Sequence, residues 1–481
     1  MDYAKSTHKV LFINGDGEEL RQPFDVHNNS EGFAYLLEAI AKTCKKRAIN
    51  RKHVVLGGEG VPSFARNFIL SLSDKGHLVL NIHAKEAKEM RQTEQASTDK
   101  LDLIGIAKSM LHGSGKPFGP HRYDSRLQDT NNPNKICITA KPYAELFADQ
   151  ETLQILTRNR GRLVQERTGC TNRIHTLIDQ LFPGFLSSAC PVSPFTKASI
   201  EIMRLPQFSA GHIARQKEST LAAKLKEWGT HDPDKSAAKL ILMAKEALSS
   251  SQRLECCLQT VLQSHLAHYE GLVSGIATIE NNLHQRLTNS PASLLLSIPG
   301  IGVVLAAGIY AELGASLLLH PLKELCSYAG IVPRVKQTGG PNKPAWTGKV
   351  RKGCNRILKN YLVQAAAKMR DWGPEGMKDV YEDLKDNGQH ADFIIAKRLL
   401  RTFKYMMVHQ TIYLPPSLRG EWNEDTRESM TTYLATTKDK IAAKWNRVGQ
   451  ARDAMEPTRP LGLWWQTIEA AFRNICGDEA A

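Results

Sequence analysis

The hydrophobic pattern changes its period along the chain, and each period predicts a different kind of element. In the first hundred residues, short apolar runs alternate with amphipathic ones. The short runs predict strands at residues 8–14, 20–26, 53–56 and 77–82. The turn Gly15-Asp16-Gly17 joins the first two as a hairpin, and Ser30 caps a helix that continues through residue 46. Strands that alternate with helices after an opening hairpin predict an α/β sheet.

From about residue 150 the apolar residues recur every seven positions, which is the spacing of a coiled coil. They are Leu156, Leu163, Cys170 and Leu177, with Ile174 and Leu181 on the adjoining stripe. The pattern predicts a second long helical region at residues 236–287. Five arginines crowd the first helix and form either a solvated face or a surface for RNA: Arg158, Arg160, Arg162, Arg167 and Arg173.

A Gly-rich turn separates two helical runs in residues 294–313, which read LLLSIPGIGVVLAAGIYAEL. This is the helix-hairpin-helix pattern, in which Gly300 and Gly302 let the backbone approach a ligand and free N–H groups face a DNA phosphate. Two other interpretations are an αα-corner in a core and a membrane span, since residues 287–311 carry no charge. Pro299 and the glycines argue against the span.

Composition narrows the function classes. With 481 residues the chain is long enough for two or three domains, and its net charge of +14 favours a polyanionic partner over a merely basic soluble protein. Nine cysteines show no CxxC spacing, which indicates a reducing cytosol and no zinc site. No apolar segment of signal-peptide type opens the chain, so we expect a cytoplasmic protein without a membrane partner.

One hydroxyl stands among cations in the loop GIVPRVKQTGG and in the helix that follows it. The hydroxyl is that of Thr338, and the cations are Arg334, Lys336, Lys349, Arg351, Lys352 and Arg356. Cations beside a hydroxyl suit attack on a phosphodiester, because they hold the phosphate and stabilise the charge that develops on its oxygens. The alternative is that Thr338 is only a turn residue.

Four carboxylates mark the α/β part. Asp2 precedes the first hairpin, Glu59 ends a strand, and Asp99 and Asp102 lie three residues apart at the start of a helix, hence on one face. Such oxygen ligands suit Mg²⁺, and two such ions can clamp the attacking and leaving oxygens of a phosphodiester. Taken singly, Asp99 also fits a helix N-terminus and Glu59 a solvated loop.

Residues 297–368 closely resemble the C-terminal domain of the insertion-sequence-one-ten family of DEDD transposases, which are RNA-guided recombinases. The resemblance lies in the order SIPGIG, AELG, LCSYAGIVPRVKQTGG, KGCNRILKNYLVQAAAK. The family's loop ends in Gln-Ser-Gly with the Ser as nucleophile, and Thr338 stands there in this sequence. Both side chains are β-hydroxyl nucleophiles, but Thr adds a methyl group and a stiffer χ1.

The N-terminal segments DYAKSTHKVL, GGEG and STDKLDLIGIA resemble the acidic motifs of the same family. The resemblance makes their acids the DEDD set, namely Asp2, Glu59, Asp99 and Asp102. Family members have several strand residues before the first Asp, whereas Met1 alone stands there in this sequence. We therefore expect either a start codon that was assigned late or a damaged metal site.

The resemblance implies a fold class of α/β plus all-α. It consists of a RuvC-like, ribonuclease-H-type N-terminal domain, a central antiparallel coiled coil and a mostly helical C-terminal transposase domain with the helix-hairpin-helix. It also implies Mg²⁺ on the acidic quartet, donor and target DNA, a structured guide RNA of the bridge type, and a homo-oligomer built as a dimer of dimers. Such a protein is bacterial and cytoplasmic, and joins the nucleoid when it is bound to DNA.

We predict a RuvC-like metal domain, a linker, a helical coiled-coil region with an insertion, a transposase domain and an extension of unknown role, at residues 1–112, 113–149, 150–290, 291–415 and 416–481. The predicted function is a DNA transposase or recombinase that cuts and rejoins insertion-element DNA through a covalent link to Thr338. Two alternatives stay open. One is a metal-dependent junction nuclease that uses water as nucleophile, and the other is a catalytically inactive nucleic-acid-binding protein.

Overall fold

The computed structural model divides the chain into two compact units, both mostly helical. Unit 1 comprises residues 1–151, 313–366 and 381–413, and unit 2 comprises 152–312, 367–380 and 414–481. The structure describes residues 1–90, 99–118, 143–287, 290–314, 316–336, 346–350, 353–373, 376–409, 411–415, 429, 432–433, 435–436 and 440.

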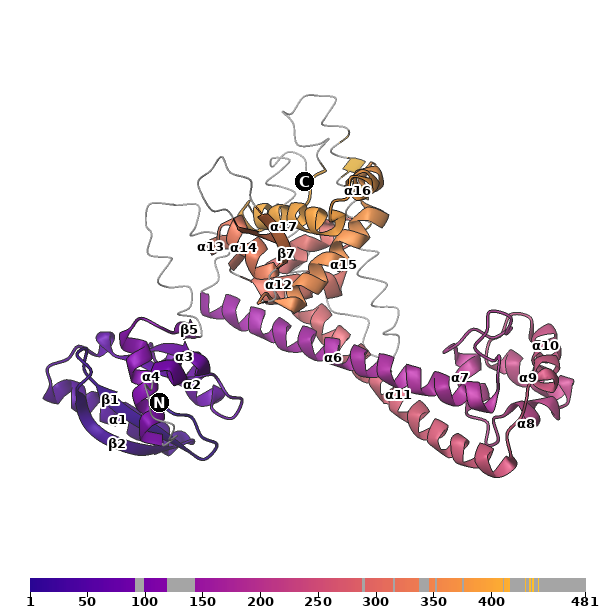
Figure 1. Ribbon diagram of the computed structural model, residues 1–481, viewed down its shortest axis with the longest axis horizontal. Coiled ribbons are helices and arrows are strands. Elements are labelled where there is room, and N and C mark those ends of the chain that lie inside the picture. The colour runs from indigo at the N-terminus through magenta and orange to yellow at the C-terminus, as the bar shows by residue number, and fades with distance from the viewer. Residues whose placement is uncertain are drawn as a thin grey trace. The chain divides into compact units, whose positions relative to one another are not determined.

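The N-terminal part of unit 1 is an α/β fold that opens with an antiparallel hairpin (Figure 1). Its strands are β1 (Thr7–Ile13), β2 (Glu19–His27), β3 (Val55–Glu59), β4 (Leu78–Ile82) and β5 (Lys116–Phe118). Its helices are α1 (Ser30–Lys46), the 3-10 helix η1 (Arg51–His53), α2 (Arg66–Asp74), α3 (Ala84–Met90) and α4 (Asp99–Leu111). Strand β3 pairs in parallel with β4, and β4 pairs antiparallel with β5. The predicted α/β character of this part is confirmed.

Two local predictions differ from the structure. Asn29, rather than Ser30, caps α1, because its side chain accepts a hydrogen bond from the Gly32 N–H at 2.8 Å. Both residue types cap helices, so the pattern did not separate these neighbours. Strand β5 lies within residues that were predicted as a linker, because a three-residue strand that contains Pro117 carries no strand pattern.

One hydrophobic core joins helices α1 and α2 to the strands. Leu36 and Ile40 of α1 are buried together with Ile69 of α2. They pack with Val10 and Val79, which lie on strands of the two sheets. The spacing of four residues between Leu36 and Ile40 places both side chains on one face of α1. The sequence predicted this helix but did not name its buried residues.

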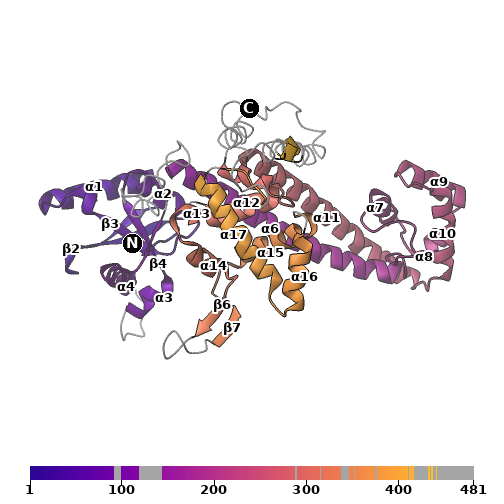
Figure 2. The ribbon, with the colours of Figure 1, turned by 90° about the horizontal axis from the view of Figure 1, so that it is seen from above.

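The two longest helices are α6 (Tyr143–Leu181) and α11 (Gln252–Leu287), and within unit 2 they run antiparallel (Figure 2). Arg160 lies 2.6 Å from Glu280, and the Cys170 thiol donates to the His265 carbonyl at 3.3 Å. The residue number falls along α11 as it rises along α6, which sets the direction. The predicted pair of antiparallel helices is present, and its supercoiling stays a prediction.

Between these two helices the chain of unit 2 forms a compact helical insertion. It consists of α7 (Lys197–Met203), α8 (Ala210–Ala214), α9 (Glu218–Glu227) and α10 (Pro233–Glu246). Phe182, Phe185 and Phe208 are fully buried at its centre, with Leu225 and Leu240 packed in the same core. The sequence pattern indicated only an insertion here.

The described C-terminal part of the chain is mostly helical. Its helices are the 3-10 helix η4 (Pro291–Ser297), α12 (Val303–Leu313), α13 (Ser316–Leu319), α14 (Leu322–Ala329), α15 (Arg356–Trp372), α16 (Met377–Asp386) and α17 (Ala391–His409), with strands β6 (Pro333–Lys336) and β7 (Trp346–Val350) before α15. The uncharged run forms η4 and α12, and most of their apolar side chains are buried in the core. No helix in the described part of the chain has the length and hydropathy that a bilayer crossing requires.

Candidate active site

Two of the predicted acids lie on adjacent backbone segments of unit 1. The Met1 amino group donates to the Gly57 carbonyl of β3 at 2.7 Å. Asp2 exchanges backbone hydrogen bonds with Lys9 of β1 at 2.9 and 3.0 Å. The segment that carries Asp2 therefore runs between β1 and β3, and Glu59 is the last residue of β3.

Two glycines of β3 decide which face these acids share. A Cβ on Gly58 would lie 2.2 Å from the Tyr3 ring, so Tyr3 covers that face. A Cβ on Gly57 would lie 2.3 Å from the Met110 sulfur, so α4 covers the opposite face. Along extended backbone, successive side chains point to opposite faces of the sheet. Asp2 is the neighbour of Tyr3 in the chain, and Glu59 is the neighbour of Gly58. Both acids therefore point to the face that α4 covers.

Helix α4 carries the other two acids. Leu103 and Ile106 are buried against the sheet side, and Asp102 lies one helical turn before Ile106 and is half-buried. Residues one turn apart share a helix face, so Asp102 is on the stripe that faces the sheet. Asp99 is the first residue of α4, and its side chain is outside the described part. The structure thus places three of the four acids at one sheet face.

The side chains behind this acidic face were not predicted. His8 is fully buried, and its Nδ1 accepts a hydrogen bond from the Ala4 N–H at 3.3 Å. Its ring packs edge-on against Tyr3 and Phe68, with centroids 5.6 and 4.7 Å away. Burial is the main cause that lowers the pKa of His8, and burial also raises the pKa of Tyr3. The strand pattern shows that His8 faces inward but not which rings it meets.

The predicted nucleophile falls outside the described residues, although the strands beside it are described. Strand β6 pairs antiparallel with β7, so the chain turns back on itself between them. Of the predicted residues, Arg334, Lys336 and Lys349 lie on these strands with side chains outside the described part, and Thr338, Arg351 and Lys352 lie outside it altogether. All six assignments stay predictions.

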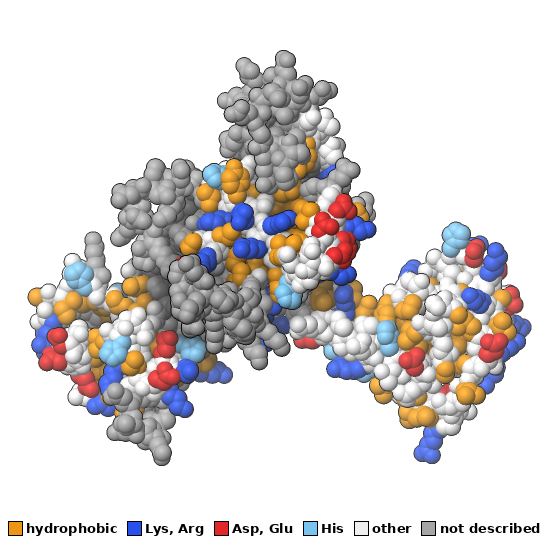
Figure 3. All heavy atoms as spheres, turned by 45° about the horizontal axis from the view of Figure 1, so that its top comes forward, with side chains coloured by type: hydrophobic (Ala, Val, Ile, Leu, Met, Phe, Trp, Pro, Cys, Tyr) orange, Lys and Arg blue, Asp and Glu red, His pale blue; other side chains and the backbone are white. Residues whose placement is uncertain are grey.

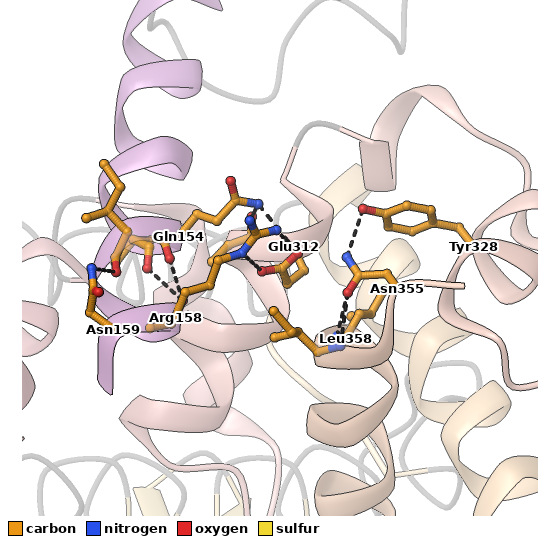
Figure 4. A network of polar contacts seen from close by, with 12 residues as sticks. Gln154, Arg158, Asn159, Glu312, Tyr328, Asn355 and Leu358 are labelled. Atoms are coloured by element: carbon orange, nitrogen blue, oxygen red, sulfur yellow. Dashed lines mark hydrogen bonds and ion pairs between the residues drawn. The ribbon is translucent and has the colours of Figure 1, made fainter. Parts of the chain in front are cut away.

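A clasp of Tyr328 and Asn355 closes the base of this hairpin (Figure 4). Asn355 caps α15, because its Oδ1 accepts hydrogen bonds from the N–H groups of Ile357 at 3.1 Å and Leu358 at 3.0 Å. Its Nδ2 donates to the Tyr328 hydroxyl, and its backbone N–H donates to the Tyr328 carbonyl, both at 2.8 Å. The exposed Arg356 follows directly. Sequence reasoning missed the clasp, although an Asn before a helix signals a cap.

The Gly-rich turn of the predicted helix-hairpin-helix packs into unit 2. Its first helical run is the 3-10 helix η4, not an α-helix. Gly300 has a φ of 76°, and a Cβ there would lie 2.8 Å from the Lys368 carbonyl oxygen. Gly300 is therefore required for close packing against the chain's own backbone. A Cβ on Gly302 would meet nothing within 4 Å, which leaves room for a ligand.

Residues 292–382 match the family model described as the transposase IS116/IS110/IS902 family, and residues 1–128 match a second model, that of the DEDD transposases of IS110. Over these two parts the chain is similar to the IS110 family of transposases. A transposase for insertion sequence element IS1111A from Coxiella burnetii is 27% identical over 253 residues, 50% of this chain and 54% of that protein. An uncharacterized 44.8 kDa protein of insertion element IS116 from Streptomyces clavuligerus is 23% identical over 363 residues, 69% of this chain and 86% of that protein. The chain spans about half the length of the Coxiella protein.

The two IS110-family models cover the two parts of the chain that carry candidate residues. The model that matches residues 1–128 includes Asp2, Glu59, Asp99 and Asp102, and the model that matches residues 292–382 includes Thr338 and the clasp. The resemblance seen in the sequence is thereby confirmed. The roles of single residues stay predictions.

The acidic motif of the IS110 family implies a divalent cation. Asp2, Glu59 and Asp102 offer only oxygen, which suits a hard ion such as Mg²⁺, and they share one sheet face. Among the described side chains, no group of three or more His, Cys, Asp or Glu is placed to hold one ion. The Asp99 side chain lies outside that set. The described donors fit Mg²⁺ in kind, and the ion itself stays a prediction.

Two of the five arginines of α6 form ion pairs with acids of other helices. Arg158 binds Glu312 through two hydrogen bonds of 2.8 and 2.9 Å, and Gln154 adds a third at 3.4 Å (Figure 4). Arg160 pairs with Glu280. Both residues hold their own helix to a neighbouring one, while 42% of the Arg158 side chain is exposed. The solvated face and the surface for RNA both stay predictions.

Proposed function

We propose that the chain is the transposase of an insertion element, which cuts and rejoins DNA through a covalent link between one of its hydroxyls and a DNA phosphate. The observation that carries the proposal is the acidic face of Asp2, Glu59 and Asp102 in a chain similar to the IS110 family. Strand exchange needs such acids together with a nucleophile. A protein that only bound nucleic acid would need neither.

Thr338 supplies the nucleophile in this proposal. Its Oγ attacks the phosphorus, the bond from phosphorus to the leaving oxygen breaks, and a phosphothreonine forms. The Thr hydroxyl loses its proton and the leaving oxygen gains one, so the cut strand ends in a free hydroxyl. Attack by a hydroxyl of a second strand reverses the step and rejoins the DNA. The number of phosphodiester bonds is conserved, so no nucleotide cofactor is consumed.

The basic residues around the hairpin hold the phosphate. Arg334, Lys336 and Arg356 stabilise the charge that develops on its oxygens. The clasp of Tyr328 and Asn355 fixes the two helices from which the hairpin extends. Mg²⁺ held by Asp2, Glu59, Asp99 and Asp102 would stabilise charge on the attacking and leaving oxygens.

The partners of this proposal are nucleic acids and further copies of the chain. A net charge of +14 supports a polyanionic partner, and the Coxiella relative is named a transposase for an insertion sequence element. We include donor and target DNA, a structured guide RNA and an oligomer built as a dimer of dimers. The phosphate contacts of the hairpin predict binding that weakens steeply with salt.

A metal-dependent nuclease is the second candidate, because it would need the acidic face but would use water in place of Thr338 as the nucleophile. The test is to trap protein–DNA adducts on a denaturing gel after incubation with nicked element DNA and Mg²⁺. Thr338→Ser is expected to form the adduct, and Thr338→Ala is expected to bind DNA without forming it. Thr347→Ala changes a hydroxyl on β7 of the same hairpin and serves as control. Cleavage by the wild type with no adduct would replace the transposase with the nuclease.

A further inference from the structure

Helix α17 in unit 1 has an exposed face that contains none of the predicted acids and no residue of the β6–β7 hairpin. Its exposed side chains include Lys397, Arg398, Arg401, Tyr405 and His409. At 3.6 residues per turn these five fall within one sector of about 120°. Along α17, Asp392 is the one acid, and it lies before all of them. We call these five residues the α17 face.

The other side of α17 is anchored in the core, so the face is held in place. Leu399 and Phe403 are buried. The Lys404 ammonium donates to the carbonyl oxygens of Leu317 at 2.7 Å and His320 at 2.9 Å. Burial of this ammonium lowers the pKa of Lys404. Lys404 is therefore a structural residue, and it does not belong to the face.

The cations of the face make no ion pair with another described residue. No carboxylate in the described part of the chain forms an ion pair with Lys397, Arg398 or Arg401, whereas Arg370 pairs with Asp371 at 2.7 Å. In Figure 3, Lys and Arg side chains gather over the C-terminal helices, and acidic side chains gather to one side of them. Three positive charges on one exposed helix face suit a polyanion.

An aromatic pair continues the face beyond the cations. The Tyr405 side chain is 59% exposed, and its ring lies against that of His409, with centroids 4.3 Å apart and planes 38° apart. By contrast, Phe393 at the start of the helix is covered by the Lys359 ammonium, 4.7 Å from its ring centroid. Tyr405 and His409 thus present ring surface to solvent directly after a row of cations.

We propose that the α17 face binds an unpaired stretch of nucleic acid, with a base stacked on the Tyr405 ring and phosphates held by Lys397, Arg398 and Arg401. Exposed aromatic rings beside cations are what single strands use, because every base has a face that can stack. In a duplex the bases stack on each other and leave no such face. The inference rests on the proposed function only in taking nucleic acid as the ligand.

The test uses the full chain and two fluorescein-labelled probes, an oligodeoxythymidine strand and a blunt duplex of equal length, with affinity measured by fluorescence anisotropy. Tyr405→Ala is expected to weaken single-strand binding roughly tenfold and to leave duplex binding nearly unchanged. Tyr405→Phe keeps the ring and is expected to bind as the wild type does. Removal of a neutral ring leaves the salt slope unchanged, whereas Arg398→Gln is expected to reduce the log–log slope on the single strand by about 0.7.

Trp372→Ala is the matched control, since Trp372 is 68% exposed but lies on α15. It is expected to leave both affinities unchanged. Equal losses on both probes with Tyr405→Ala, or the same loss with Trp372→Ala, would overturn the inference. If the wild type bound neither probe, the proposed function would fail as well. If the wild type formed the Thr338 adduct and Tyr405→Ala bound single strands normally, the α17 inference alone would be wrong.

Discussion

Arg158 binds Glu312 across 154 residues of sequence, with Nε donating to Oε1 at 2.8 Å and Nη2 to Oε2 at 2.9 Å. The Glu312 side chain is fully buried, whereas 42% of the Arg158 side chain is exposed. A guanidinium can make both bonds at once, and an ammonium cannot. The pair fastens α6 to the end of α12 within unit 2.

Arg158→Leu should destabilise the fold more than Glu312→Gln does. Loss of the guanidinium leaves a buried carboxylate without that cation, which costs about 3 kcal/mol. Neutralising Glu312 leaves an arginine that water reaches, which costs about 1 kcal/mol. Urea unfolding followed by circular dichroism measures both. Arg158→Lys, which keeps the charge and loses the two-bond geometry, should lie between them, and equal costs for all three variants would contradict the role of burial.

Gly300→Ala should lower the unfolding free energy by about 2 kcal/mol, because its φ of 76° is strained for Ala and the added Cβ meets the Lys368 backbone. Gly302→Ala should change it by less than about 0.5 kcal/mol, because that site is open. Thermal unfolding compares the two. If the open backbone at Gly302 meets a phosphate, Gly302→Ala still weakens duplex binding. Unchanged binding would remove Gly302 from the nucleic-acid surface.

The clasp predicts a graded loss of activity. Asn355→Asp keeps the helix cap, and its carboxylate accepts a hydrogen bond from the Tyr328 hydroxyl, so it should cost little. Asn355→Ala loses the cap and should lower stability by about 1 kcal/mol. Tyr328→Phe removes only the side-chain bond of the clasp. We expect the yield of covalent adduct to fall in the order wild type, Asn355→Asp, Tyr328→Phe, Asn355→Ala.

Tyr381→Phe is the control for the clasp. It removes a tyrosine hydroxyl that bonds to Asp392 at 3.2 Å, outside the hairpin and the helices that flank it. Its adduct yield should equal that of the wild type, and urea midpoints show whether stability explains any change. Should Tyr328→Phe also match the wild type, the clasp would have no part in orienting the hairpin.

Much of the fold was predictable, because the elements with long or regular patterns are set by their own residues. The seven-residue spacing around Cys170 and Ile174 identified α6, and alternating strands identified the α/β part. The fold of the insertion was not predictable. Its helices are 5 to 14 residues long, too short for the period to define a buried face. Their core forms only when Phe208 meets residues from α9 and α10.

The candidate site was predictable in its residue types but not in its contacts. Acids at a strand end and at a helix start indicated Asp102 and Glu59 because metal chemistry needs oxygen. The sequence does not show that a carboxylate 154 residues away meets Arg158. Tyr328 and Asn355 are likewise 27 residues apart, and only the folded hairpin brings them together. Contacts between distant segments depend on packing, which a linear pattern does not contain.

Gly58→Ala tests whether the packing behind the acidic face sets the position of the acids. A Cβ there would lie 2.2 Å from Cε2, 2.4 Å from Cζ and 2.6 Å from Oη of Tyr3, so the ring must move. The Tyr3 ring is held by His8, and a shift of the ring also displaces Asp2, its neighbour in the chain. A displacement of about 1 Å in a catalytic site costs about a hundredfold in rate. Mg²⁺-dependent DNA cleavage should fall by about that factor.

Gly57→Ala is the matched control on the same strand. Its Cβ would meet the Met110 sulfur at 2.3 Å, but this is the flexible end of a long side chain that moves aside at little cost. Cleavage should therefore stay near that of the wild type. In a Tyr3→Ala background the ring is gone, so Gly58→Ala should cause almost no further loss. Losses that simply add would show that Gly58 acts independently of Tyr3, and the acids would then be positioned by another part of the sheet.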